Sequence, residues 1–261
     1  MPKFPFPICD LLGMPIARTD KEGVLDHLFI SVGQGRGGWL VTANLDFLRR
    51  HARDPDARRL YGGADVCVAD GMPLVWAARL QGDRLPERIA GSDLLPLLAE
   101  RAEREGRRIY LLGGDPTTNT QAVDVLQNRW PKLVIAGHTS PSIGSPPTDA
   151  QLASLRDEMI RTRPDFLLVG MGSPKQEQVI EALRATLPGA WMIGVGVSFS
   201  FVAGSLRRAP AWMQRTGLEW FWRMVQEPRR LVRRYLVEDL PFLFELVASV
   251  LVQRARGRLR R

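Results

Sequence analysis

The chain has 261 residues, 45% of them hydrophobic and 25% charged, which favours one large α/β domain, or such a domain with an appendage. Its two cysteines and three histidines share no close spacing, so we expect neither a disulfide framework nor a zinc site. The first residues contain one lysine and are interrupted by prolines. They lack the pattern of a signal peptide, and we expect a cytoplasmic protein.

The net charge of +8 belongs to the C-terminal segment. Residues 205–261 hold thirteen arginines and no lysine against five acidic residues, whereas residues 1–204 are neutral overall. Such a segment suits a nucleic acid, an anionic membrane or a phosphorylated substrate. We therefore divide the chain into an α/β domain, residues 1–204, and a basic helical appendage, residues 205–261.

Apolar runs and amphipathic stretches alternate along the first part of the chain. Thr19 opens a predicted helix that ends near residue 31, and Thr148 is a predicted N-cap. The predicted strands are almost continuously apolar, which is typical of a parallel sheet with helices on both faces. We predict a Rossmann-like, mostly parallel sheet with strands at 39–42, 65–69, 108–114, 132–137, 165–170 and 190–196. The strands are joined by a helix that begins near residue 44 and by helices at about 72–80, 92–105, 120–129, 149–162 and 174–187.

Polar and glycine residues fall at or just after the predicted strand ends. Ligands bind at the carboxyl ends of parallel strands, so these residues are expected to line one rim. They are Thr42, Asn44, Asp70, Gly113, Gly172 and Gly196. Asp70, in "VADG", is either a turn or cap residue or a carboxylate that accepts a proton from a substrate hydroxyl. Its position at a strand end favours the second interpretation.

Three short motifs have competing interpretations. The segment "GMGSPKQE", residues 170–177, with Pro174 at the first helical position, either cradles a diphosphate or makes a turn. "GVGVSF" from Gly194 lacks the full dinucleotide fingerprint, which disfavours a dinucleotide-dependent oxidoreductase. "DPD", residues 54–56, has the form of a metal-binding pair in sugar transferases, but a helix N-cap at Asp54 explains it better, and we expect no metal.

The appendage has the features of a membrane-surface segment. "PRRLVRRYLVEDL" places arginines at helical spacing and predicts a basic amphipathic helix on an anionic surface. The apolar run 240–252 is too short to span a bilayer and predicts interfacial contact, which the final "RARGRLRR" reinforces. Trp212 and Trp222 lie at headgroup level or pack on the body, and for Trp220 packing is favoured. A nucleic-acid-binding protein is the alternative, but the sequence shows no recognition motif and the neutral body offers no basic groove.

Several blocks together resemble one enzyme family. "VTANLDF", "ADVCVADGMPLV", "LPERIAGSDLL", "YLLGG", "PDFLLVGMGSPKQE", "GVGVSFSFVAGSLRRAP" and "GLEWFWRMVQEPRRLVRRYL" follow the order of the WecG/TagA/CpsF glycosyltransferases over roughly residues 8–236. The resemblance implies transfer of a hexose, with inversion and without a metal or other cofactor, from a UDP-sugar to a sugar on a polyprenyl diphosphate lipid. It also implies peripheral attachment to the inner face of the cytoplasmic membrane, and a homo-oligomer is compatible with it.

The resemblance also implies roles for residues of this chain. Asp70 matches the general base. The substrate-binding positions that it implies are Thr42, Asn44, Arg88, Gly172, Lys175 and Gln176 in the body, and Arg223, Arg230 and Arg233 in the appendage. Two positions depart from the family pattern, since Ser200 stands where many members have aspartate and Ala43 where they have proline. Both departures concern which sugar is used, and the reaction class is expected to survive them.

Overall fold

A six-stranded parallel sheet forms the centre of the molecule, as the sequence predicts. The structure is a computed structural model and describes the backbone of residues 4–259 and the side chains of residues 4–255. The sheet strands are β3 (Gly38–Ala43), β4 (Val66–Ala69), β5 (Arg108–Gly113), β6 (Val134–Thr139), β7 (Phe166–Gly170) and β8 (Trp191–Gly194). Their order is β4-β3-β8-β7-β5-β6, and all neighbours run parallel.

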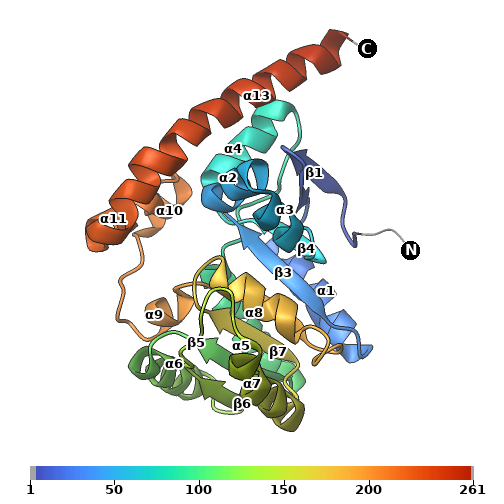
Figure 1. Cartoon of the computed structure of the whole chain (residues 1–261), viewed down its shortest axis with the longest axis vertical. Helices are drawn as coiled ribbons and strands as arrows, with labels where there is room; N and C mark the ends of the chain where they lie inside the picture. The colour runs from blue at the N-terminus through green and yellow to red at the C-terminus, as the bar shows by residue number, and fades with distance from the viewer. Residues whose placement is uncertain (1–3, 260–261) are drawn as a thin grey trace.

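The apolar strands are continuous because both faces of the sheet are covered (Figure 1). Successive side chains point to opposite faces, so Leu111 and Leu112 enter different hydrophobic clusters. One cluster is completed by α1 (Lys21–Gly33), α5 (Gly91–Glu105) and α6 (Pro116–Arg129). The other is completed by α2 (Leu45–Arg53), α3 (Pro55–Tyr61), α4 (Met72–Gln81), α7 (Asp149–Thr162) and α8 (Lys175–Leu183).

Local details confirm some of the predicted caps and correct others. Thr148 caps α7 in a reciprocal capping box with Gln151. The N-cap of α1, however, is Asp20, whose carboxylate accepts from the Gly23 N–H, so the prediction of Thr19 as the cap is wrong. Pro174 is the N-cap of α8 and not its first helical residue, so the helix begins at Lys175, one residue later than predicted.

An N-terminal hairpin escaped the sequence analysis. Strands β1 (Ile8–Leu11) and β2 (Met14–Ala17) pair antiparallel, and both turn residues, Leu12 and Gly13, have positive φ. This is the two-residue turn that suits the twist of a hairpin, but it usually carries Asn-Gly or Asp-Gly rather than Leu-Gly. The Gly13 N–H donates to the Asp10 carboxylate at 2.9 Å, so a side chain from β1, and not an Asn or Asp in the turn itself, stabilises the turn.

The appendage is helical and lies across one end of the sheet (Figure 1). After α9 (Ser198–Val202), the chain forms α10 (Ala211–Arg215), α11 (Glu219–Gln226), α12 (Pro228–Val232), a π-helical segment η1 (Arg233–Asp239) and α13 (Leu240–Leu259). Phe242, Leu246 and Val250, four residues apart, are buried on α13, which packs along α4. Phe244 and Leu251 on its other side are exposed.

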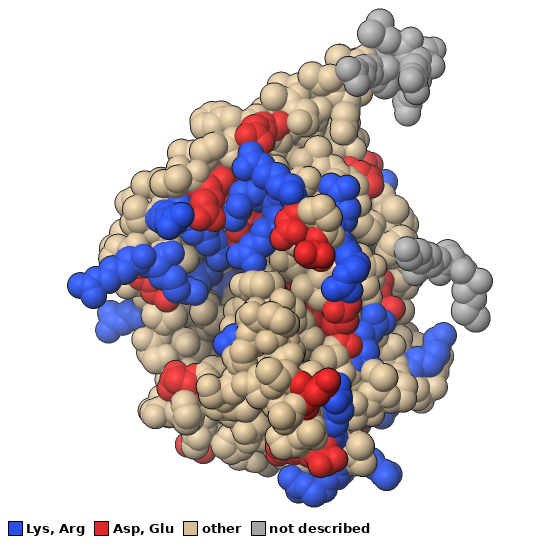
Figure 2. Space-filling model, viewed as in Figure 1, with Lys and Arg blue, Asp and Glu red and all other residues tan. Residues whose placement is uncertain are grey.

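The predicted basic amphipathic helix is split between α12 and η1. Leu231 is buried, and Arg234 turns toward the body instead of solvent, so only part of the segment presents arginines outward. Figure 2 shows basic side chains gathered on this face with acidic ones among them. Within the described residues, no helix is long and apolar enough to cross a membrane. The terminal "RARGRLRR" lies almost wholly outside the described side chains.

Candidate active site

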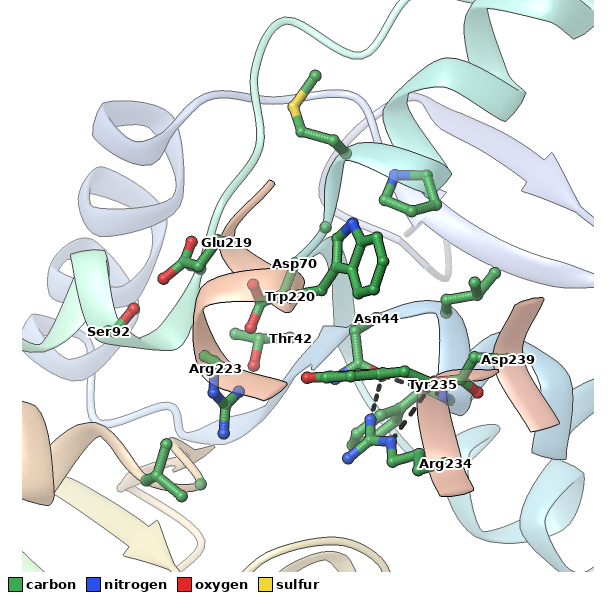
Figure 3. Close-up of a pocket in the computed structure, with 18 of the residues that line it drawn as sticks. Thr42, Asn44, Asp70, Ser92, Glu219, Trp220, Arg223, Arg234, Tyr235 and Asp239 are labelled. Atoms are coloured by element: carbon green, nitrogen blue, oxygen red, sulfur yellow. Dashed lines mark hydrogen bonds and ion pairs between the residues drawn. The ribbon is translucent and has the colours of Figure 1, made fainter. Parts of the chain in front are cut away.

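A cavity of about 340 Å³ lies where the appendage meets the carboxyl ends of β3, β4 and β8 (Figure 3). Most residues singled out in the sequence line it, namely Thr42, Asn44, Asp70, Arg88, Gly172, Gln176, Gly196, Arg223 and Arg230. Lys175 and Arg233 do not line it. The Arg233 side chain is 84% exposed and lies 3.8 Å from the Glu238 carboxylate. Ser200 and Gly113 also lie outside the lining.

Asp70 follows β4 directly and faces the cavity. Its N–H donates to the Ala43 carbonyl at 2.7 Å, which holds the backbone against the end of β3. The N-cap of the following helix α4 is Gly71, without a side-chain hydrogen bond, so the helix-cap interpretation of Asp70 is wrong. Among the described residues, none forms a hydrogen bond with the Asp70 carboxylate in this structure.

The environment of Asp70 makes it a stronger base than an ordinary aspartate. Burial raises the pKa of Asp70 from 3.8 to about 6. Arg88 and Arg223 lower this pKa, whereas Glu219 and Asp93 raise it. The carboxylate is therefore ionised at neutral pH and has a higher proton affinity than a solvated aspartate.

Thr42 and Asn44 come from the end of β3, beside Asp70. The Thr42 hydroxyl donates to the Gly194 carbonyl at 3.3 Å and so ties β3 to β8. The Asn44 side-chain oxygen caps α2 by accepting from the N–H groups of Asp46 and Phe47, and it also accepts from Arg234 at 3.3 Å. The oxygen of Asn44 is therefore occupied, and its amide nitrogen is the group that can serve a ligand.

Gln176 links the two glycine motifs, "GMGSPKQE" and "GVGVSF", by a hydrogen bond. Its amide oxygen accepts from the Gly196 N–H at 3.1 Å, and its nitrogen donates to the buried Glu177 carboxylate at 2.6 Å. A Cβ on Gly194 would lie 2.5 Å from that nitrogen, so the glycine makes room for Gln176. Gly172, by contrast, has φ of +72°, and a Cβ built there would meet no atom within 4 Å, which leaves this side of its backbone open at the cavity.

The appendage contributes cations to one side of the cavity. Arg223 on α11 lies over the Phe201 ring, 6.0 Å from its centroid, and 3.7 Å from the Glu227 carboxylate. Arg230 on α12 pairs with the same carboxylate at 2.6 Å. One acid thus holds two arginines at the cavity wall.

Several lining residues were missed by sequence reasoning. Glu219, Arg234, Tyr235 and Asp239 lie in the appendage helices, and nothing in the local pattern distinguishes them from solvent-facing neighbours. Trp220 also lines the cavity, with its ring 5.9 Å from that of Tyr235, and keeps 38% of its surface exposed. Its ring contacts, with Phe221 and Tyr235, lie within the appendage itself.

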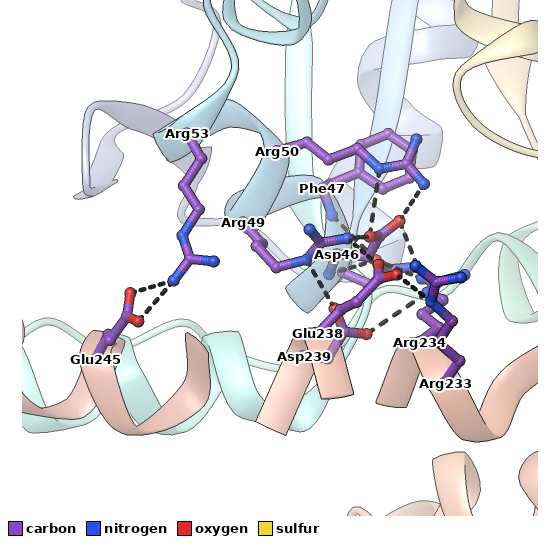
Figure 4. Close-up of polar contacts among 11 residues, drawn as sticks. Asp46, Phe47, Arg49, Arg50, Arg53, Arg233, Arg234, Glu238, Asp239 and Glu245 are labelled. Carbon is purple, nitrogen blue, oxygen red and sulfur yellow. Dashed lines mark hydrogen bonds and ion pairs between the residues drawn. The ribbon is translucent and has the colours of Figure 1, made fainter. Parts of the chain in front are cut away.

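A charge network joins η1 to α2 (Figure 4). The buried Asp46 carboxylate lies 2.5 Å from Arg49, 2.8 Å from Arg50 and 3.4 Å from Arg234. Arg234 also lies 3.5 Å from Asp239, whose pKa burial raises to about 6. This network sets the position of η1 against the body.

The "DPD" motif lies outside this site. Asp54 is the N-cap of α3, with its carboxylate accepting from the Asp56 N–H at 2.9 Å, and both acids are exposed. The helix-cap interpretation of the motif is confirmed.

Comparison with known families gives a match over nearly the whole chain. The model of the glycosyl transferase WecG/TagA/CpsF family matches residues 9–256, which extends the resemblance seen in the sequence through most of α13. The chain belongs to this family, and it is a glycosyltransferase of the kind that acts in cell-surface polysaccharide synthesis.

Proposed function

We propose that this member of the WecG/TagA/CpsF family transfers a hexosyl group from a UDP-sugar to a sugar carried on polyprenyl diphosphate, with inversion and without a metal ion. The observation that carries the proposal is the Asp70 carboxylate, which faces a cavity of about 340 Å³ without a hydrogen bond from any described residue and with its pKa raised to about 6. A free, partly desolvated carboxylate is suited to accept a proton.

In the proposed reaction, the acceptor hydroxyl attacks the anomeric carbon of the donor while Asp70 takes the hydroxyl proton. The new glycosidic C–O bond forms on the face opposite the diphosphate, the bond from the anomeric carbon to the diphosphate oxygen breaks, and UDP leaves. Thr42 and the amide nitrogen of Asn44 would orient the acceptor beside the base. Gly172 and Gln176 would hold the donor near the β7 and β8 loops.

The leaving diphosphate needs compensating positive charge. Arg223 and Arg230 reach the cavity from the appendage, and guanidinium groups match phosphate oxygens in both charge and geometry. Both arginines are held by Glu227 at the cavity wall, so they are already placed before the donor arrives. We assign Lys175 and Arg233, which lie outside the lining, no contact with the reacting groups.

The appendage is also the proposed membrane contact, at the inner face of the cytoplasmic membrane. Phe244 is 68% exposed on the side of α13 that faces away from α4, and exposed arginines of α12 and η1 precede it. An amphipathic segment of this kind binds the interface through apolar contact and attraction to acidic lipid headgroups.

The enzymatic proposal is tested by UDP release. A screen would offer UDP-glucose, UDP-N-acetylmannosamine and its uronic acid with a synthetic polyprenyl-diphosphate-sugar acceptor. Asp70→Asn should abolish transfer on the accepted donor and leave UDP binding nearly intact, whereas Asp157→Asn, a matched change on the exposed side of α7, should keep full activity. Wild-type turnover in Asp70→Asn would overturn the assignment of the base.

The membrane proposal is tested by flotation of the full chain with vesicles containing phosphatidylglycerol, with duplex DNA binding measured in parallel. Phe244→Asp should release the protein from the vesicles. Val125→Asp, at an exposed apolar position on α6, should leave flotation unchanged. A chain that binds DNA and ignores the vesicles would favour the nucleic-acid alternative.

A further inference from the structure

Four charged side chains form a closed ring beside Asp70, and only one of them, Arg88, was expected in the site. Arg88 lies 2.6 Å from Glu219 and 3.1 Å from Asp93, and Arg208 lies 2.5 Å from Asp93 and 3.6 Å from Glu219. All four are at most about a quarter exposed. Arg88 and Asp93 belong to the body, whereas Arg208 and Glu219 belong to the appendage, so two ion pairs of the ring, Arg88 with Glu219 and Arg208 with Asp93, join the two parts at short distance.

The ring determines where Arg88 points. Its Nη1 donates to Glu219 and its Nη2 to Asp93, so both terminal nitrogens are held by carboxylates other than Asp70. Arg88 still affects Asp70 through its charge, without a hydrogen bond to it. Bidentate pairing with a carboxylate is the favoured geometry of a guanidinium, so an Arg88 released from Glu219 would have Asp70 as an alternative partner.

Glu219 is one of the two ring members that the appendage supplies, and it is the one that contacts Arg88. It is the first residue of α11, and Arg223 follows one helical turn later on the same side, facing Asp70 (Figure 3). As an acid in the first turn, Glu219 also stabilises α11 through the helix dipole, but that stabilisation does not depend on contact with Arg88. Glu219 itself lines the cavity, and its contact with Arg88 at 2.6 Å ties it to the ring.

We propose that Glu219 is a positioning residue of the transfer reaction, which holds Arg88 on Asp93 and away from Asp70 so that the Asp70 carboxylate stays free for the acceptor proton. The inference rests on the proposed role of Asp70 as the base. On this proposal, the Asp70 carboxylate is free to act as a base only when α11 is docked. Among the described ion-pair partners of Arg88, the body supplies only Asp93, and Glu219 comes from the appendage.

The charged groups that face Asp70 come from each element packed around it. They are Arg88 from the loop after α4, Asp93 from α5, and Glu219 and Arg223 from α11. Replacing Glu219 by glutamine removes a negative charge from this set and weakens the hold on Arg88. Both effects favour the ionised form of Asp70 and make it a weaker base.

The decisive experiment measures the titration of Asp70 directly, in the full chain labelled with ¹³C at aspartate carboxyl groups. The Asp70 resonance is assigned by its loss in Asp70→Asn. In Glu219→Gln we expect its midpoint to fall by about one pH unit, with the acidic limb of kcat/KM displaced equally. Glu219→Asp should restore the wild-type midpoint. Glu245→Gln removes an exposed appendage acid that pairs with Arg53 and should change nothing.

Arg208→Gln separates positioning from loosening of the appendage. Without Arg208, Arg88 is the only ring partner left for Asp93 and Glu219, so it stays held away from Asp70. The titration midpoint of Asp70 should therefore rise, because a nearby cation is lost, or stay in place. A general loosening would admit water and lower the midpoint in both Arg208→Gln and Glu219→Gln. An unchanged midpoint in Glu219→Gln would overturn the inference while leaving Asp70 as the base. Activity in Asp70→Asn would overturn the base assignment whatever the titration shows.

Discussion

Replacing Asp70 by asparagine should stabilise the protein at neutral pH while it destroys activity. A pKa raised from 3.8 to about 6 means that the folded state binds the proton of Asp70 more tightly than the unfolded state does. Ionised Asp70 therefore costs the folded protein stability above pH 6. At roughly 1.4 kcal/mol per pH unit, a shift of this size corresponds to about 2 to 3 kcal/mol.

The cost should disappear as the pH falls. Below pH 3.8 the carboxyl group is protonated in both the folded and unfolded states, so it no longer penalises folding. Asparagine lacks the titration, and the difference in stability between the two proteins should therefore shrink between about pH 6 and pH 4. Asp239, whose pKa is also raised to about 6, titrates in both proteins and cancels from the comparison.

Thermal unfolding at a series of pH values tests this reasoning. At pH 7.5, Asp70→Asn should raise the unfolding midpoint by roughly 5–10 °C, given about 2–4 °C per kcal/mol for a chain of this size. Asp157→Asn, at an exposed position, should change stability by less than about 0.5 kcal/mol. A destabilised Asp70→Asn at pH 7.5, or a difference that does not depend on pH, would refute the desolvation argument.

Three further changes probe other parts of the structure. Leu246→Ala, at a fully buried position between α13 and α4, should lower the free energy of unfolding by about 2–5 kcal/mol, measured in urea, and should speed proteolysis of the appendage. Equal proteolysis of the variant and the wild type would contradict the docking of α13 on α4. Gly194→Ala places a Cβ 2.5 Å from the Gln176 amide and should weaken UDP binding in calorimetry, whereas unchanged affinity would show that Gln176 does not shape the donor site. Asp54→Ala should lower stability by about 1 kcal/mol and leave transfer unchanged. Loss of transfer in Asp54→Ala, together with a wild-type activity that depends on added divalent cation, would revive the metal interpretation.

The fold of the body and the position of its rim follow from the sequence because their signals are local. Continuous apolar runs require a sheet buried on both faces, and such a sheet brings the ends of β3, β4 and β8 together. Thr42, Asn44 and Asp70 could therefore be placed on one rim from their position relative to strand ends. The hairpin β1–β2 escaped because its Leu-Gly turn carries no recognisable turn signal.

The other half of the site was decided only by tertiary structure. Sequence reasoning assigned Arg233 to the cavity, yet Arg234 is the residue that reaches Asn44, across a separation of 190 residues. Glu219 meets Arg88 across 131 residues. Neighbouring arginines are equivalent in a sequence, and which of them faces inward depends on how η1 and α11 pack on the body. The sequence determined where Asp70, the proposed base, lies, whereas docking of the appendage decided which charges surround it, because those contacts exist only after distant helices have packed together.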